Sequence, residues 1–181
     1  MEIVPICYFC ETKNDKYIIC DPQITACFTG HRSYDGSGDE ALCQAIRTLY
    51  AEGYRIFLSG MAVGFDLAAA EMVLSLRTEL PDIQLVAVLP FKGMDSKFSE
   101  QDKRRFASIL AAADKTITLA TDYSVMAYTL RNNFLVDNAT ATIAYFDGSK
   151  GGTAYTVRRA VKRLHRYINL WQNPQWQLFV R

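Results

Sequence analysis

Two glycine-rich segments place small residues where phosphate chemistry would use them. Residues 59–66 (SGMAVGFD) follow a short apolar run and precede an alanine-rich helical pattern, and residues 147–153 (DGSKGGT) follow another apolar run. The first N–H groups of a helix have no intrahelical acceptor and carry the positive end of the helix dipole, so such turns can bind an anion. The pattern predicts a phosphate site, although glycines at these corners also serve close packing alone.

The composition is that of an ordinary globular protein of one domain. The chain has 181 residues, of which 50% are hydrophobic and 22% are charged, so it can bury a sizeable core. Twenty basic and nineteen acidic residues leave a net charge of +1, which makes nucleic acid or an anionic membrane an unlikely main partner. Because no apolar run approaches the roughly 20 residues of a membrane span and no signal-peptide pattern is present, we expect a cytoplasmic protein.

Cysteine and basic residues suggest two further sites, and we expect neither to be used. Cys7 and Cys10, with Cys20 nearby, could begin a zinc or redox site, but the second pair of ligands that a tetrahedral shell needs does not follow. We therefore expect no metal. A basic helix face near the C-terminus is typical of a solvated surface, with nucleic acid as the lesser alternative. This face consists of Arg158, Arg159, Lys162, Arg163 and Arg166.

The order of apolar runs predicts an α/β fold. Near-continuous apolar runs at residues 24–29, 56–58, 83–89, 115–120 and 140–146 are typical of strands that are covered on both faces, and helical spacing fills the intervals between them. This alternation predicts a Rossmann-like open parallel sheet with helices on both faces. We expect residues 1–23 to add a small hairpin, residues 24–168 to form the domain with a last helix reaching Ile168, and residues 169–181 to pack on it as a tail.

The candidate site segments all follow strands. Ligands of open parallel sheets bind beyond the C-terminal ends of the strands, where the strand order reverses. Gly30 to Arg32, residues 59–66 and residues 147–153 are each expected at such an end. The position of the three segments favours a shared binding site over packing alone.

Four motifs in this order resemble the set that defines the YpsA-like branch of the SLOG superfamily. They are residues 29–32 (TGHR), residues 59–66 with Glu71, Arg131-Asn132 with residues 135–137, and residues 147–148 with 151–153. The superfamily joins the cytokinin-activating LOG proteins with the DNA-processing Smf/DprA proteins. The resemblance covers residues 24–168 and implies a Rossmann-like domain that binds a nucleotide-derived ligand such as an adenine nucleotide, NAD or ADP-ribose, as a sensor or regulatory module.

The resemblance also implies roles for individual residues. Glycines of both turns would bring backbone N–H groups to phosphate, and Arg32 and Arg131 would supply guanidinium groups. Asp66 and Glu71 would accept hydrogen bonds from ribose, or else cap a helix and form an ion pair. The expected ligand-binding residues are Gly30, His31, Arg32, Ser59, Gly60, Met61, Ala62, Gly64, Asp66, Glu71, Arg131, Gly151, Gly152 and Thr153.

Several alternatives stay open. His31 would either brace its loop or take part in chemistry, and Tyr34, Phe65, Phe91 and Tyr123 would either pack or stack on a base. LOG proteins carry a glutamate three residues after their glycine-rich run, where this chain has Thr156, so only Asp66 and Glu71 are candidates for the carboxylate of an N-glycosidic hydrolase. A DNA-binding role like that of Smf/DprA is the third alternative. No cofactor is required, and self-association stays open.

Overall fold

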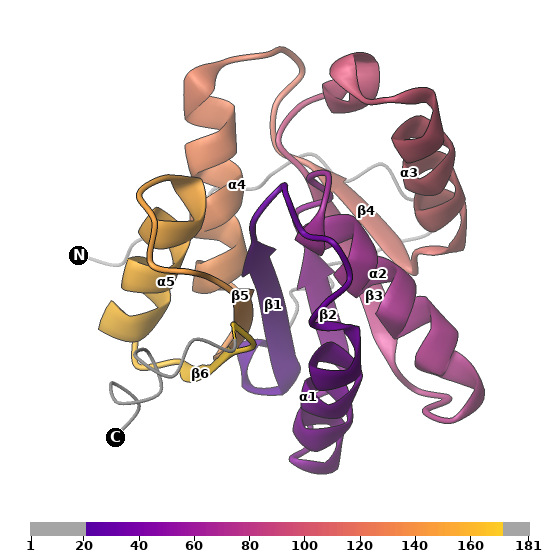
Figure 1. Ribbon diagram of the computed structural model, residues 1–181, viewed down its shortest axis with the longest axis vertical. Coiled ribbons are helices and arrows are strands. Elements are labelled where there is room, and N and C mark those ends of the chain that lie inside the picture. The colour runs from indigo at the N-terminus through magenta and orange to yellow at the C-terminus, as the bar shows by residue number, and fades with distance from the viewer. Residues whose placement is uncertain (1–20, 172–181) are drawn as a thin grey trace.

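Short apolar runs form a six-stranded, all-parallel sheet in the order β4-β3-β2-β1-β5-β6 (Figure 1). The computed structural model describes residues 21–171. The strands are β1 (Thr25–Gly30), β2 (Ile56–Ser59), β3 (Gln84–Leu89), β4 (Lys115–Thr118), β5 (Ala141–Tyr145) and β6 (Arg166–Asn169). The helices are α1 (Asp39–Ala51), α2 (Phe65–Ser75), α3 (Glu100–Ala112), α4 (Val125–Asp137) and α5 (Gly152–Lys162). Three short 3-10 turns lie at Pro22–Ile24, Leu76–Thr78 and Met94–Lys97.

The continuous apolar runs divide between two cores because successive side chains of a strand point to opposite faces. In β1, Ala26 and Phe28 join the larger core, whereas Cys27 between them joins the smaller one. The same alternation separates Leu85, Ala87 and Leu89 of β3 from Val86 and Val88. Helices α1, α2 and α3 pack side by side over the first face, and α4 and α5 pack together over the second (Figure 1). The predicted fold class and the five predicted strands are therefore confirmed.

The strand order reverses between β1 and β5, the two central neighbours of the sheet. After β1 the chain adds β2, β3 and β4 on one side, and it then returns through α4 to place β5 and β6 on the other. The Ser124 side chain caps α4 by accepting a hydrogen bond from the backbone N–H of Ala127 at 3.0 Å. The first turns of α4 rise past the C-terminal edge of β1, so this helix forms a wall beside the reversal point (Figure 1).

The C-terminal part of the domain differs from the prediction. We expected the last helix to reach Ile168, but α5 ends at Lys162, and residues 166–169 form the sixth strand, β6. Leu164 adopts a left-handed conformation with φ of 59° and is 90% exposed, so it leads the chain out of the helix instead of facing the core. Leu164 and Ile168 continue the helical spacing of apolar residues, but pairing of Tyr167 with Thr142 of β5 makes residues 166–169 a strand.

Most of the predicted N-terminal hairpin and tail lies outside the described residues. This applies to residues 1–20, with Cys7, Cys10 and Cys20, and to residues 172–181. Within residues 21–171, no helix is both long and apolar enough to cross a membrane.

Candidate functional site

A cavity of about 340 Å³ lies at the C-terminal edge of the sheet, beyond the paired ends of β1 and β5. Its walls come from the segment after β1, the turn before α5, one face of α4 and part of the turn before α2. It is lined by Phe28, Thr29, Gly30, His31, Arg32, Ala62, Asp66, Tyr128, Arg131, Asn132, Leu135, Ser149, Lys150, Gly151, Gly152 and Thr153. The topology thus brings together four segments, the first and last of which are more than 100 residues apart in the sequence.

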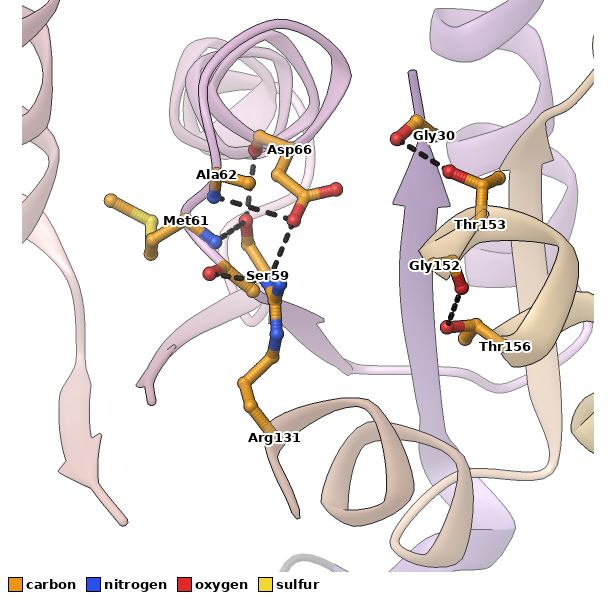
Figure 2. A network of polar contacts seen from close by, with 10 residues as sticks. Gly30, Ser59, Met61, Ala62, Asp66, Arg131, Gly152, Thr153 and Thr156 are labelled. Atoms are coloured by element: carbon orange, nitrogen blue, oxygen red, sulfur yellow. Dashed lines mark hydrogen bonds and ion pairs between the residues drawn. The ribbon is translucent and has the colours of Figure 1, made fainter. Parts of the chain in front are cut away.

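The glycine turn before α5 opens into this cavity. Gly151 is the N-cap of α5 and offers no side chain to its first N–H groups. A Cβ atom placed on Gly151 would meet nothing within 4 Å, and one on Gly152 would meet only Asn132 Nδ2 at 3.8 Å. Thr153 Oγ1 donates to the carbonyl of Gly30 at 3.0 Å and ties the turn to the end of β1 (Figure 2). The turn is therefore fixed in place while its amides stay accessible.

The glycine turn before α2 is closed by the protein itself. The Ser59 hydroxyl donates to the carbonyl of Asp66 at 2.8 Å and accepts from the N–H of Met61 at 3.2 Å (Figure 2). The N–H of Ala62 donates to Asp66 Oδ2 at 3.3 Å. At the start of α2, the N–H of Phe65 donates to the carbonyl of residue 31 at 3.2 Å. These donors are already bound, so this turn does not offer them to a ligand.

Gly64 lets the turn before α2 approach the backbone that follows β1 closely. It has φ of 84°, and a Cβ there would collide with the backbone carbonyls of His31 and Arg32. Positive φ and this close approach both require glycine. The second glycine of the motif therefore serves packing between the two strand-end loops.

Arg131 closes the first turn from the other side. This buried residue reaches from α4, and its Nη1 donates to the carbonyl of Gly60 at 2.6 Å and to Asp66 Oδ2 at 3.0 Å (Figure 2). A Cβ on Gly60 would overlap the guanidinium group, so Gly60 makes room for the arginine. Burial lowers the pKa of Arg131 and raises that of Asp66, and the attraction between the two charges opposes both changes.

One atom of this arginine has no partner among the described residues. Arg131 Nε is buried and makes no hydrogen bond within residues 21–171, although a buried guanidinium N–H normally finds an acceptor. The side chain is only 8% exposed and lines the cavity. An acceptor supplied by a ligand would complete its hydrogen bonding.

His31 braces the two strand ends. Its Nε2 lies 2.8 Å from Asp147 Oδ1 and 3.2 Å from the backbone nitrogen of Asp147. One ring nitrogen cannot donate and accept at once, and the shorter contact favours donation to the carboxylate. Hydrogen bonds from Ser149, and then the charge of His31, lower the pKa of Asp147. This arrangement corresponds to the bracing alternative for His31.

Two cationic side chains of the cavity remain free of ion pairs within residues 21–171. Arg32 follows β1, and Lys150 lies in the turn before α5, and both are exposed at the cavity wall. They leave the cavity with a positive rim, since Asp66 is paired with Arg131 and Asp147 with His31.

Glu71 lies outside this cavity. Both of its carboxylate oxygens accept hydrogen bonds from Arg105 of α3, at 2.9 and 2.7 Å. With Arg105 and Gly64 it lines a second hollow of about 470 Å³, whose other charged residues, Asp35 and Asp39, are acidic. We regard the smaller cavity as the candidate site because its free charges are basic. Ser59, Gly60 and Met61 are buried beside it and do not line it.

The wall formed by α4 was only partly foreseen. Sequence reasoning expected only Arg131 of this helix to bind ligand, although Asn132 and Leu135 belong to the same motif, and it did not name Tyr128; all four residues line the cavity. These residues recur at intervals of three and four, which is the spacing of one helix face. That spacing could have identified them once α4 was known to stand beside the reversal point.

Three of the five basic residues expected on the last helix form ion pairs with neighbouring carboxylates. Arg159 and Arg163 both bind Asp137 of α4, at 2.7 and 2.9 Å. Arg166 lies in β6 and not in the last helix, and it binds Glu52 at 2.8 Å. In the described part of the chain, no three His, Cys, Asp or Glu side chains gather as a metal ion would require.

A family model that covers most of the chain identifies the relatives. The model for YpsA, described as the YspA SLOG family, matches residues 39–171. The chain belongs to this SLOG family. A UPF0398 protein of Halalkalibacterium halodurans is 32% identical over 127 residues, which cover 68% of this chain and 67% of the relative. A UPF0398 protein of Bacillus cereus is 28% identical over 144 residues, covering 75% of this chain and 78% of the relative.

Two solved structures share the fold of this SLOG protein. DNA processing protein A (DprA) of Helicobacter pylori, described with its single-stranded DNA binding mode, matches with a TM-score of 0.64 and 18% identity. The match covers 86% of this chain and 69% of that structure. DprA of Streptococcus pneumoniae matches with a TM-score of 0.61 and 17% identity, over 80% of this chain and 49% of that structure. The chain thus spans about half the length of the second protein, and at these identities the likeness shows the fold alone.

Proposed function

We propose that the cavity beyond the C-terminal ends of β1 and β5 binds the phosphate of a nucleotide-derived ligand, and that the protein is a sensor or regulatory binding module. The observation that carries this proposal is the open N-terminus of α5, which faces a cavity with free basic side chains. Adenine nucleotides, NAD and ADP-ribose are the candidate ligands.

The supporting chemistry comes from three sides of the cavity. The first amides of α5 carry the positive end of the helix dipole and point donors at an anion. Lys150 and Arg32 add exposed cationic side chains at the rim. Arg131 adds a buried N–H without an acceptor among the described residues. Charge-assisted hydrogen bonds of this kind are about twice as strong as neutral ones, so a phosphoryl group suits the site better than a neutral ligand.

The hydrogen-bond partners of Asp66 and Glu71 favour ligand binding over hydrolysis. An N-glycosidic hydrolase needs a carboxylate that can stabilise developing positive charge or activate water. Asp66 is held by Arg131 and Ala62, and Glu71 is held by Arg105 outside the cavity. Thr156, which stands where LOG proteins carry a glutamate, donates its hydroxyl to the carbonyl of Gly152 at 3.0 Å (Figure 2). Each candidate carboxylate already has a structural partner.

A binding experiment with a product assay tests the proposal. The full chain is titrated with AMP, ADP-ribose and NAD by calorimetry, and the mixtures are then separated to detect free base or nicotinamide. We expect saturable binding, intact ligand and a raised melting temperature, with about 2.7 kcal/mol of added stability at a ligand concentration of 100 Kd. Lys150→Ala should weaken binding, whereas Lys162→Ala on the far part of α5 should not. Absence of binding by all three ligands, or release of base, would contradict the proposal.

DNA binding is the competing proposal because of the fold shared with DprA. It predicts an affinity for single-stranded DNA that falls steeply as salt is added, since displaced counterions drive such binding. The pairing of Arg159 and Arg163 with Asp137 reduces the charge that α5 could offer to a phosphate backbone. Titration of an oligonucleotide at several salt concentrations, beside AMP, distinguishes the two proposals.

A further inference from the structure

Exposed apolar side chains gather at the start of α4, directly beside the cavity wall. Tyr123, Val125, Met126 and Leu130 are 67%, 73%, 62% and 38% exposed. They account for four of the seven large hydrophobic residues that are exposed in the described part of the chain. Apolar surface concentrated next to a polar cavity is typical of a binding site. We therefore expect an apolar group of a bound molecule to cover the start of α4.

The tyrosines at this end are held by a buried ring. Phe91, which is 6% exposed, contacts Tyr123 edge-to-face at 5.4 Å between ring centroids and Tyr128 at 5.6 Å. Tyr123 and Tyr128 contact each other at 6.4 Å. Tyr128 lines the cavity and Tyr123 lies at the surface, so the cluster runs from the inside of the site to its outside. Rings anchored in this way keep their faces in place without further loss of side-chain freedom.

Other aromatic residues around the strand ends are committed to packing. Phe65 is fully buried and stacks on Tyr145 at 5.8 Å. Tyr34 lies edge-to-face against both of these rings, and its hydroxyl donates to Asp39 at 2.6 Å. Phe28 lines the cavity but is 0% exposed. Of the described phenylalanine and tyrosine residues that line the cavity, Tyr128 is the one with exposed surface, and its ring contacts the exposed ring of Tyr123.

The position of Tyr128 relative to the phosphate site fits a nucleotide. Tyr128 and Asn132 are one helical turn apart on the same face of α4, and Asn132 Nδ2 lies 3.8 Å from the position of a Cβ on Gly152. The α4 wall thus leads from the first turn of α5, past a side-chain amide, to the aromatic cluster. A ribose would span this interval between its phosphate and its base.

We propose that Tyr128 and Tyr123 form the surface on which the base of the bound nucleotide stacks, so the site selects nucleoside phosphates over sugar phosphates. This inference rests on the proposed function, because it places the base relative to a phosphate at α5. Stacking on tyrosine accepts any base, since every base has a flat π surface. The site is therefore expected to be selective for the presence of a base more than for its identity.

Paired ligands separate the stacking surface from the phosphate site. The full chain is titrated with AMP and with ribose 5-phosphate, which lacks the base. We expect AMP to bind at least about tenfold more tightly, and we expect this ratio to fall toward one in the variants Tyr128→Leu and Tyr123→Ser. Ribose 5-phosphate should bind these variants as it binds the wild type. Val161→Ser, at a 53% exposed position of α5 away from the cluster, is the matched control and should change neither affinity.

The outcomes distinguish the two proposals. Equal affinity for AMP and ribose 5-phosphate in the wild type, with both lost in Lys150→Ala, would overturn the stacking surface and leave the phosphate site standing. No binding of either ligand would overturn the proposed function itself. Melting temperatures show whether Tyr128→Leu, which removes a ring packed on Phe91, remains folded, and Tyr123→Ser provides the test at an exposed position. A change in self-association by Tyr123→Ser with unchanged AMP affinity would assign the surface to a second copy and overturn the inference.

Discussion

The two glycine turns look alike in the sequence and differ in the structure. Both follow a central strand, both contain a glycine with positive φ, and both lead into a helix whose N-cap has no side-chain hydrogen bond. The turn before α2 is filled by Arg131 and by the backbone of residues 31 and 32. The turn before α5 has open space at Gly151 and an ordinary contact at Gly152. A glycine motif therefore predicts a close approach but does not say whether a ligand or the protein itself makes it.

The difference follows from what each glycine has to accommodate. Gly60 makes room for Arg131 of α4, and Gly64 makes room for the backbone that follows β1. Both distant segments therefore pack against the start of α2. Gly151 and Gly152 leave the amides of α5 accessible from the cavity. We therefore expect substitutions in the first turn to change stability and substitutions in the second to change binding.

The largest effect is expected from breaking the ion pair at the closed turn. Arg131→Met leaves Asp66 buried without its partner and should lower the free energy of unfolding by about 3–5 kcal/mol. Urea denaturation followed by circular dichroism measures the change. Arg159→Met, which breaks a more exposed pair with Asp137, is the control and should cost about 1 kcal/mol or less. A loss at Arg131 no greater than at Arg159 would show that the pair does not hold the turn.

Gly64→Ala should destabilise the protein by at least about 2 kcal/mol. The added methyl group suffers both the penalty of positive φ and a collision with the carbonyls of His31 and Arg32. Gly53→Ala is a matched control, because Gly53 has φ of 101° but nothing within 4 Å of a Cβ. Thermal unfolding of both variants separates the cost of backbone conformation from that of the collision. Equal losses would mean that the first turn is not closely packed.

Gly152→Ala, in the second turn, should weaken binding without lowering stability. Its Cβ meets only Asn132 at van der Waals distance, and alanine favours a helix more than glycine does, so stability should be unchanged or slightly higher. The methyl group would nevertheless stand between α4 and the first amides of α5, and AMP affinity should fall about tenfold or more. Calorimetric titration beside the wild type measures this. Full affinity in the folded variant would place the phosphate elsewhere.

The smallest effect concerns the pH dependence of the open turn. Hydrogen bonds from Ser149 and the charge of His31 hold the pKa of Asp147 below its usual range in the folded protein. Stabilisation from a carboxyl with a lowered pKa is present above the pKa of the unfolded chain and is lost as pH falls through the folded value. Wild type should therefore exceed Asp147→Asn in stability by under about 1 kcal/mol at pH 7, and the gap should close below about pH 4. A gap that stays constant with pH would assign the effect to shape instead of charge.

Local patterns carried most of the fold. Apolar runs located the first five strands, because each run is long enough to cross the sheet and is followed by a polar or turn-forming segment. The sixth strand was missed because its four residues, 166–169, are defined by pairing with β5 and not by their own pattern. Among the site residues, the segments after β1 and β5 were placed correctly at strand ends, since this follows from the order of elements.

The sequence by itself determined the parallel α/β architecture and the three loop segments that follow strands at the C-terminal edge, because strand, turn and helix signals act within a few neighbouring residues. Only the tertiary structure decided which glycine turn is open. That depends on Arg131, about 70 positions after Gly60, and on the chain after β1, whose carbonyls fill the space beside Gly64. Long-range contacts of this kind leave no local pattern, so two similar motifs could acquire different roles.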